Sequence, residues 1–425
     1  MRTACLMLAA VGIAAAQARD DGALERAREM LRAEIERLPK YTCTETIDRT
    51  YFGGTAQPRA ICDLVVAQRR SGQAHMVAVA TDRLRFDVEI ADGGYEIVSW
   101  PGAGRVGNER MEDMASGGPI GTGPFGPFLI DIFANTGTQI DFLRKQNGEL
   151  EYRFRVPLAA SHYRVGADAL YRPAAYDGRF WLEAASAQLK RVEVRTAELP
   201  RDTRACEATT QVDFTPARIG EGEYLIPKQG KLTVIGRDGD ETTNVTKYTA
   251  CREFHGESTI HFGEAPVEAA KEASAVRAGR AIPAGLLVTL AMQGGIDTAT
   301  AAAGDPVTAK VVKSVIDPVS KRVVLEAGAV VEGRIVHLEH RLLDHHFLMT
   351  VRFDAPPLIL DHTLGIDDPK EINTKAPPCS ARADRIQSVG RLPAGGTFVL
   401  PEKNGRHVTP PGCTSRWVTV LPSGK

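Results

Sequence analysis

RLRFDVEIA, residues 83–91, decides the fold class of this 425-residue chain. Apolar residues at 84, 86, 88 and 90 alternate with charged residues at 83, 85, 87 and 89. This period of two is typical of a strand with one buried face. Similar runs recur between residues 41 and 254, separated by turn signals such as Asn147-Gly148 and Asp238-Gly239. Because strands follow one another directly, we expect antiparallel hairpins and no parallel β-α-β units.

The predicted elements fall into two blocks. An amphipathic helix is expected over residues 22–38, with Leu24, Ala27, Leu31, Ile35 and Leu38 on one face. Strands are expected at 41–51, 83–91, 95–100, 150–156, 180–182, 189–196, 210–214, 224–235 and 242–254. A second set is expected at 286–293, 306–315, 322–325, 330–339, 346–354, 397–401 and 415–421.

The predicted fold is therefore mainly β. An N-terminal helix plus an antiparallel half-barrel sheet spans residues 19–262, and an Ala/Glu-rich linker spans 263–280. A smaller β-barrel domain with a Pro/Gly-rich C-terminal extension follows over 281–425.

Composition excludes several classes of protein. Hydrophobic residues make up 43% of the chain and charged residues 25%, as in ordinary globular proteins. The 52 basic residues nearly balance the 53 acidic ones, whereas nucleic-acid-binding domains are usually basic. We therefore expect no nucleic-acid partner, and no motif indicates a cofactor.

The N-terminus has the pattern of a secretory signal peptide. Met1-Arg2 precedes an apolar run over residues 3–16, and Ala16-Gln17-Ala18 forms a small-x-small cleavage site. The run is shorter than the roughly 20 residues that span a bilayer. We expect residues 1–18 to be removed, leaving a periplasmic or secreted protein with no transmembrane helix in the mature chain.

The cysteines agree with export. Cleavage would remove Cys5 and leave an even set, which in an exported protein suggests disulfides. The remaining six are Cys43, Cys62, Cys206, Cys251, Cys379 and Cys413. If each domain pairs its own cysteines, Cys379 bonds Cys413, and the pairing of the other four stays open.

A Gly/Pro-rich segment over residues 114–136 interrupts the strand pattern. One interpretation is a loop leading into a short helix that packs over the sheet. The other is a mobile apolar lid over a cavity. In this second interpretation the lid consists of Phe125, Phe128, Ile132 and Phe133, and the cavity wall includes Trp100 and Trp181; the tryptophans could equally be core residues.

Four of the ten histidines fall within ten residues, as His337, His340, His345 and His346. Imidazoles bind zinc or copper, but this spacing matches neither His-Glu-x-x-His nor its inverse. The alternative is a solvated hairpin, in which the imidazoles scatter around an exposed turn. With no Gly-x-Ser-x-Gly motif either, we expect no metal site and no enzyme activity.

Two stretches resemble known families. Residues 282–354 are similar to the β-barrel module of conjugative-transfer (TrbI-like) channel proteins, with matches at Thr300, Gly304-Asp305, Val307, Gly328 and Gly333. DGRFWLE at 177–183 with LKRV at 189–192 resembles the periplasmic lipoprotein-carrier (LolA-like) half-barrels, with Glu183 where Asp is usual. The second resemblance implies a concave sheet that shelters an acyl chain under a helical lid.

The whole arrangement resembles two-domain exported proteins of Gram-negative bacteria with no assigned function. Three hypotheses follow. The leading one is a non-catalytic cell-envelope protein that binds a lipid-like or other apolar ligand in the half-barrel. The alternative is a structural or interaction protein of an envelope assembly, with a protein partner and no small ligand. An envelope metalloprotein or hydrolase is the third.

Overall fold

The computed structural model describes residues 21–37, 39–53, 61–72, 76–90, 96–102, 114, 129–167, 170–196, 199–253, 282–354, 356–360, 379, 388 and 392–421. The fold is mostly β with few helices, and it includes a closed six-stranded antiparallel barrel. The predicted fold class is confirmed.

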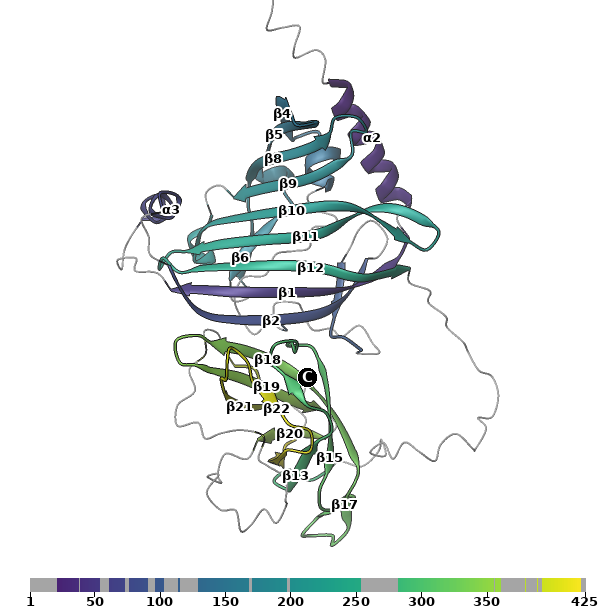
Figure 1. The fold of residues 1–425 in the computed structure, drawn as a ribbon, viewed down its shortest axis with the longest axis vertical. Helices are drawn as coiled ribbons and strands as arrows, with labels where there is room; N and C mark the ends of the chain where they lie inside the picture. The colour runs from purple at the N-terminus through teal and green to yellow at the C-terminus, as the bar shows by residue number, and fades with distance from the viewer. Residues whose placement is uncertain are drawn as a thin grey trace, which may run out of the picture.

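The first sheet is antiparallel throughout, in the order β4-β5-β8-β9-β10-β11-β12-β1-β2-β3 (Figure 1). Its strands are β1 (Tyr41–Gly53), β2 (Val77–Ile90), β3 (Glu96–Ser99), β4 (Gln139–Gln146), β5 (Glu149–Val156), β8 (Tyr176–Glu183), β9 (Leu189–Thr196), β10 (Ala205–Ile219), β11 (Gly222–Gly236) and β12 (Glu241–Glu253). Buried and half-buried residues alternate along β1 and most of β2, as the sequence predicts for strands with one apolar face.

Several short elements pack against this sheet. The helix α2 (Asp21–Arg37) and the π-helix η2 (Ile130–Ala134) pack on its inner face, in one apolar cluster with β5, β8, β9 and β10. The hairpin of β6 (Arg164–Ala167) and β7 (Leu170–Pro173) joins them, with two short 3-10 turns, η3 (Leu158–Ala160) and η4 (Arg201–Thr203). The helix α3 (Cys62–Arg70) has contacts with β10.

The barrel closes in the order β13-β15-β18-β19-β20-β23, with β23 returning to β13. Its strands are β13 (Leu287–Met292), β15 (Pro306–Val311), β18 (Val330–Arg341), β19 (His346–Asp354), β20 (Pro357–Leu360) and β23 (Thr414–Thr419), and β21 (Gly396–Pro401) also pairs with β19. Two small ladders, β14 (Ile296–Asp297) with β22 (Val408–Thr409) and β16 (Val315–Ile316) with β17 (Val323–Leu325), lie outside it. The wholly buried Trp417 fills the barrel core.

The two β bodies are joined by direct strand pairing. The end of β18 pairs with β2, with Glu339 opposite Asp82. Farther along β2, Arg85 donates its backbone N–H to the carbonyl of Ala303 at 2.7 Å, and its guanidinium forms an ion pair with Asp305. Gly304 adopts a φ of +111°, and a Cβ there would strike the backbone oxygen of Arg85. The sequence predicted a linker between the bodies but did not predict this pairing.

Three disulfides cross-link the described part of the chain. Cys43–Cys251 links β1 to β12, Cys62–Cys206 ties α3 to β10, and Cys379–Cys413 forms as the domain argument predicted. The structure therefore confirms the use of all six cysteines and supplies the pairing that the sequence left open. Cys5 and the predicted signal peptide lie outside the described residues.

No helix in the described ranges has both the length and the apolar character needed to cross a membrane.

Candidate functional site

The inner face of the first sheet is an apolar surface rich in aromatic rings. Tyr152 stacks on Phe180 with ring centroids 4.9 Å apart, and Phe133 of η2 meets Phe180 edge-on at 4.8 Å. All three side chains are buried. Such aromatic pairs hold their geometry well, so this region is a packed core in the state described.

The helix α2 covers this core with small side chains. Among the side chains of α2 whose burial the structure describes, Ala23, Ala27 and Leu31 are buried, with Leu24 partly buried beside them. Burying one leucine and two methyl groups stabilises by only about 4 kcal/mol. These described side chains therefore contribute less burial than the aromatic layer beneath them.

The π-helix η2 is fixed by a buried carboxylate. Asp131 has no exposed surface, and its Oδ2 accepts hydrogen bonds from the Tyr176 hydroxyl at 3.0 Å and from the His162 backbone N–H at 2.8 Å. The imidazole of His162 pairs with the other oxygen, Oδ1. Burial and the adjacent Asp131 carboxylate raise the pKa of Tyr176. Short π-helices often occur at functional sites. This one is held to β8 by the Asp131–Tyr176 hydrogen bond, and its apolar side chains Ile132 and Phe133 are buried in the core.

A second buried carboxyl lies on the inner face, in β1. The Oε1 atom of Glu45 accepts a hydrogen bond from the Tyr248 hydroxyl at 3.1 Å, while Oε2 has no partner among the described residues. Burial raises the pKa of Glu45 to about 7, against the opposing effect of the Tyr248 hydrogen bond. Glu45 thus gives the described part of the inner face a carboxyl oxygen with spare hydrogen-bonding capacity.

The predicted ligand-binding residues do not gather in one place. Ile132 and Phe133 are buried in the same apolar cluster as α2, packed in the core. Trp100 belongs to a different cluster, where it stacks on Phe86 at 5.3 Å and lies near the barrel residue Gly304. Trp181 lies on the opposite face of the sheet and lines an outer pocket. Phe125 and Phe128 fall outside the described residues.

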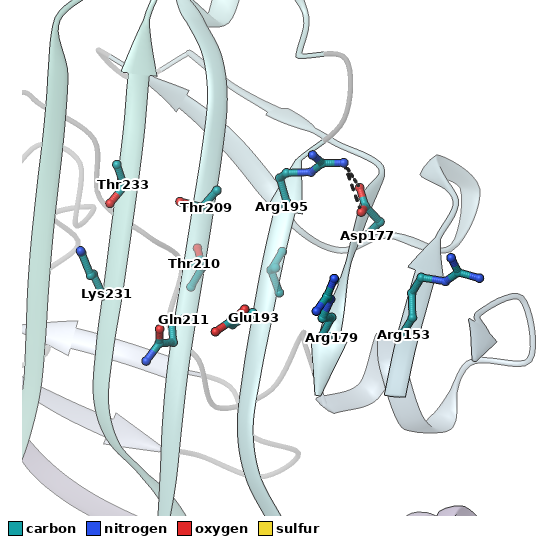
Figure 2. Close-up of a pocket in the computed structure, with 12 residues that line it drawn as sticks. Arg153, Asp177, Arg179, Glu193, Arg195, Thr209, Thr210, Gln211, Lys231 and Thr233 are labelled. Atoms are coloured by element: carbon teal, nitrogen blue, oxygen red, sulfur yellow. Dashed lines mark hydrogen bonds and ion pairs between the residues drawn. The ribbon is translucent and has the colours of Figure 1, made fainter. Parts of the chain in front are cut away.

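The outer face of the same sheet carries a polar pocket of about 590 Å³ (Figure 2). Strand register sets one row of its side chains directly across β5, β8, β9, β10 and β11. In order, this row is Arg153, Arg179, Glu193, Gln211 and Lys231. Five strands at ~4.8 Å spacing make the row roughly 19 Å long, which suits an extended ligand lying across the strands.

Positive charge predominates in this pocket. Four basic side chains face two acidic ones, and three of the basic groups are arginines in ion pairs: Arg153 with Asp141, Arg179 with Glu151, and Arg195 with Asp177. Lys231 makes no ion pair with a described residue. Arginine forks held by carboxylates present remaining N–H groups in fixed directions.

A second outer pocket of about 470 Å³ continues along the face. Trp181 lies there beside Lys190, Arg191 and Lys228, with Asp213 paired to Arg191. An indole among basic side chains offers a stacking surface in a cationic setting. The sequence prediction assigned Trp181 to an apolar wall and missed this face.

The histidine cluster is divided by the β18–β19 hairpin. The predicted hairpin is confirmed, but the expectation of an exposed turn is wrong for His337, whose surface is only 4% exposed and which lies 3.2 Å from Glu339. His340 stacks on Phe347 and pairs with Glu402, and His345 also reaches Glu402. Within the described chain, no three histidine, cysteine or acidic side chains are arranged to hold a metal ion.

Sequence reasoning missed the outer row and the buried acids. Charged residues alternate with apolar ones along β5 and most of β8 and β9, and that signal was present in the sequence. The register between strands, which places Arg153 beside Arg179 and Gln211 beside Lys231, depends on the fold.

Comparison with known proteins adds little. No protein family and no curated protein matches the sequence. Among solved structures, a LolA superfamily protein from Nitrosomonas europaea aligns over 55% of this chain and 93% of its own, with 11% identity and a TM-score of 0.24. A likeness this low supports no inference about the fold or function of this chain, which rest on the geometry above.

Proposed function

We propose that this protein is an exported, non-catalytic binding protein that takes a lipid-like or other apolar ligand onto the inner face of its first sheet, beneath α2. The supporting observation is the mismatch between an aromatic, apolar face and the light cover over it. Among the side chains of α2 that the structure describes, two alanines and one leucine are buried, and their burial contributes about 4 kcal/mol. An apolar ligand would recover that energy by burying its own surface.

The chemistry of the inner face also indicates the type of ligand. Phe133 and Phe180 provide apolar contact beneath α2, and Glu45, farther along the inner face in a separate cluster with Tyr248, offers an oxygen that can accept a hydrogen bond. A long apolar chain ending in a hydroxyl or amine would satisfy both. Export after cleavage behind Ala18 would place the protein where such lipids are handled, and the three disulfides are compatible with that compartment.

The test is uptake of a dansyl-labelled fatty alcohol, followed by its fluorescence. Leu31→Ala should weaken the cover and increase the uptake rate several-fold, and Phe133→Ala should weaken affinity by removing apolar contact with the ligand. Trp181→Ala, on the outer face, is the matched control and should behave as wild type. Absence of uptake by wild type, Leu31→Ala and Phe133→Ala, all folded by circular dichroism, would leave the alternative of a ligand-free interaction protein.

A specific observation favours a second candidate function, the binding of an extended anionic ligand by the outer polar row. The arginines of this row are preorganised and Lys231 has no ion pair in the described chain. A fluorescent sulfated oligosaccharide should bind in a salt-dependent way and lose about fivefold in affinity with Lys231→Ala. Arg172→Ala, which removes an exposed ion pair with Asp202 elsewhere, is the control. Equal binding by both variants would contradict this function.

A further inference from the structure

The hairpin over residues 315–325, here the distal hairpin, is a separate element of the second body. Its strands β16 and β17 form a two-stranded ladder outside the closed barrel. Val315 and Leu325 at its base are buried in the barrel core. The hairpin is thus firmly rooted, and the part beyond the root projects from the barrel.

The projecting part exposes three large apolar side chains. Ile316 and Val323 are cross-strand neighbours, 54% and 51% exposed, and Val319 at the turn is 89% exposed. Single exposed apolar residues are ordinary on protein surfaces. Three on one short hairpin form a patch of the kind that marks an interaction site.

The turn that carries Val319 is held in one shape. The Asp317 carboxylate accepts hydrogen bonds from the Val319 backbone N–H at 2.9 Å and the Ser320 hydroxyl at 2.6 Å. Backbone bonds between Asp317 and Arg322 and between Lys321 and Asp317 close the loop, both at 2.9 Å. The apolar tip is therefore preorganised, which lowers the conformational entropy lost on binding.

Basic side chains surround this tip. Lys321 and Arg322 are exposed within the hairpin, and Arg322 makes no ion pair with a described residue. Of the two acidic residues nearby, Asp317 uses its carboxylate to hold the turn, and Glu326 lies beyond the buried root. An apolar tip with a cationic rim complements a surface that is apolar inside and anionic at its boundary.

The location leaves the tip accessible. β18 pairs with the first sheet through its last residues, near Arg341, whereas the distal hairpin precedes its first residue, Val330. Figure 1 shows β17 at the end of the barrel farthest from β1 and β2. A β18 of 12 residues separates these positions by roughly 40 Å, so the tip can meet a planar surface without contact by the first sheet.

We propose that the distal hairpin docks the protein on a bilayer carrying anionic lipids. Val319, Ile316 and Val323 enter the boundary between headgroups and acyl chains, and the basic rim contacts anionic headgroups. This membrane contact goes beyond the proposed ligand binding and does not depend on it. A protein groove could accept the apolar tip, but the basic rim favours the lipid surface.

Flotation with phosphatidylcholine vesicles, with and without phosphatidylglycerol, tests this proposal on the full mature chain. Wild type should bind only the anionic vesicles, and less at high salt. Val319→Asp should weaken binding at least tenfold, and Lys321→Glu about fivefold. Both positions are exposed, so neither change should disturb folding.

Leu343→Asp is the matched control. Leu343 is 59% exposed in the β18–β19 turn, at the opposite end of the barrel, and receives the same new charge. It should bind vesicles as wild type does. The proposal is overturned if wild type does not bind anionic vesicles, if Val319→Asp and Leu343→Asp weaken binding equally, or if Val319→Asp abolishes capture of a protein partner while vesicle binding is unchanged.

Discussion

The ion pair between Arg49 and Asp82 gives the sharpest test of how the first sheet is stabilised. Arg49 is 1% exposed, and its Nε lies 2.7 Å from Oδ1 of Asp82 while its Nη2 lies 2.5 Å from Oδ2. The Tyr51 hydroxyl donates to the same carboxylate at 3.0 Å. Burial alone would lower the pKa of Arg49, but the Asp82 carboxylate outweighs it and the pKa is raised. The guanidinium therefore stays charged in the interior.

Asp82→Ala removes the carboxylate and leaves this charge buried. Breaking a buried pair by removing one partner typically costs ~3–5 kcal/mol. The nearby Glu339 carboxylate also acts on Arg49, so we expect the lower end of that range, about 3 kcal/mol. Because Asp82 is opposite Glu339 in the β2–β18 pairing, amide hydrogen exchange should also rise at residues 339–341.

Urea denaturation of the oxidised protein measures the loss. The control is Asp141→Ala, which breaks the pair with Arg153, where both side chains are more than 60% exposed; it should cost at most about 1 kcal/mol. The double variant Arg49→Met with Asp82→Leu should recover most of the stability, because neither member of the pair then leaves the other charged and unpaired in the interior. The reasoning fails if Asp82→Ala and Asp141→Ala cost the same.

Three further predictions concern other parts of the chain. The pKa of Glu45 is about 7 in the folded state and lower in the unfolded state, so the folded state binds more protons between about pH 4.5 and 7. The free energy of unfolding should therefore fall by about 3 kcal/mol as the pH rises through that window. In urea titrations Glu45→Gln should lack this fall, and parallel pH profiles for wild type and Glu45→Gln would contradict the prediction. Intact mass of the mature protein should be six hydrogens below the reduced form, and Cys379→Ser with Cys413→Ser should cost ~3–4 kcal/mol in thermal or urea unfolding; free thiols would refute the pairing. Gly304→Ala should destabilise the contact with β2 by ~1–3 kcal/mol because of its positive φ and the clash with Arg85, whereas Gly285→Ala, where nothing lies within 4 Å, should show only the φ penalty; equal losses for the two would count against the clash.

The elements that the sequence predicted well have one clearly buried face. β9 begins and ends as predicted, at 189–196. β19 also has its predicted bounds, 346–354, although five consecutive residues in it are buried. The edge strand β4 was missed because nearly all its residues are exposed or half-buried, so no alternation appears. The helix α3 was missed for a similar reason: among its nine residues only Val65 is buried, and a disulfide holds the helix in place.

The candidate sites were predictable only in part. The apolar positions Ile132 and Phe133 were identified from the sequence because a run of large apolar residues follows a Gly/Pro-rich segment. The outer row could not be identified from the sequence. Arg153 and Lys231 lie on the same surface only because the three strands between them pair in a particular register. The burial of Glu45 was not predicted either. Glu45 occupies a position of β1 that faces the core, where the alternation would predict an apolar residue.

The pairing of β2 with β18 also sets the order of events during biogenesis. β2 is complete at Ile90, but its partner is complete only at Arg341, about 250 residues later. β1 likewise waits for β12, the strand that its disulfide reaches across a separation of 208 residues. At ~5–20 residues per second of synthesis, the β2 edge would stay open for tens of seconds, and open edges recruit other strands. A chain with such late-arriving partners is exposed to wrong strand pairing until residues 330–341 have been made.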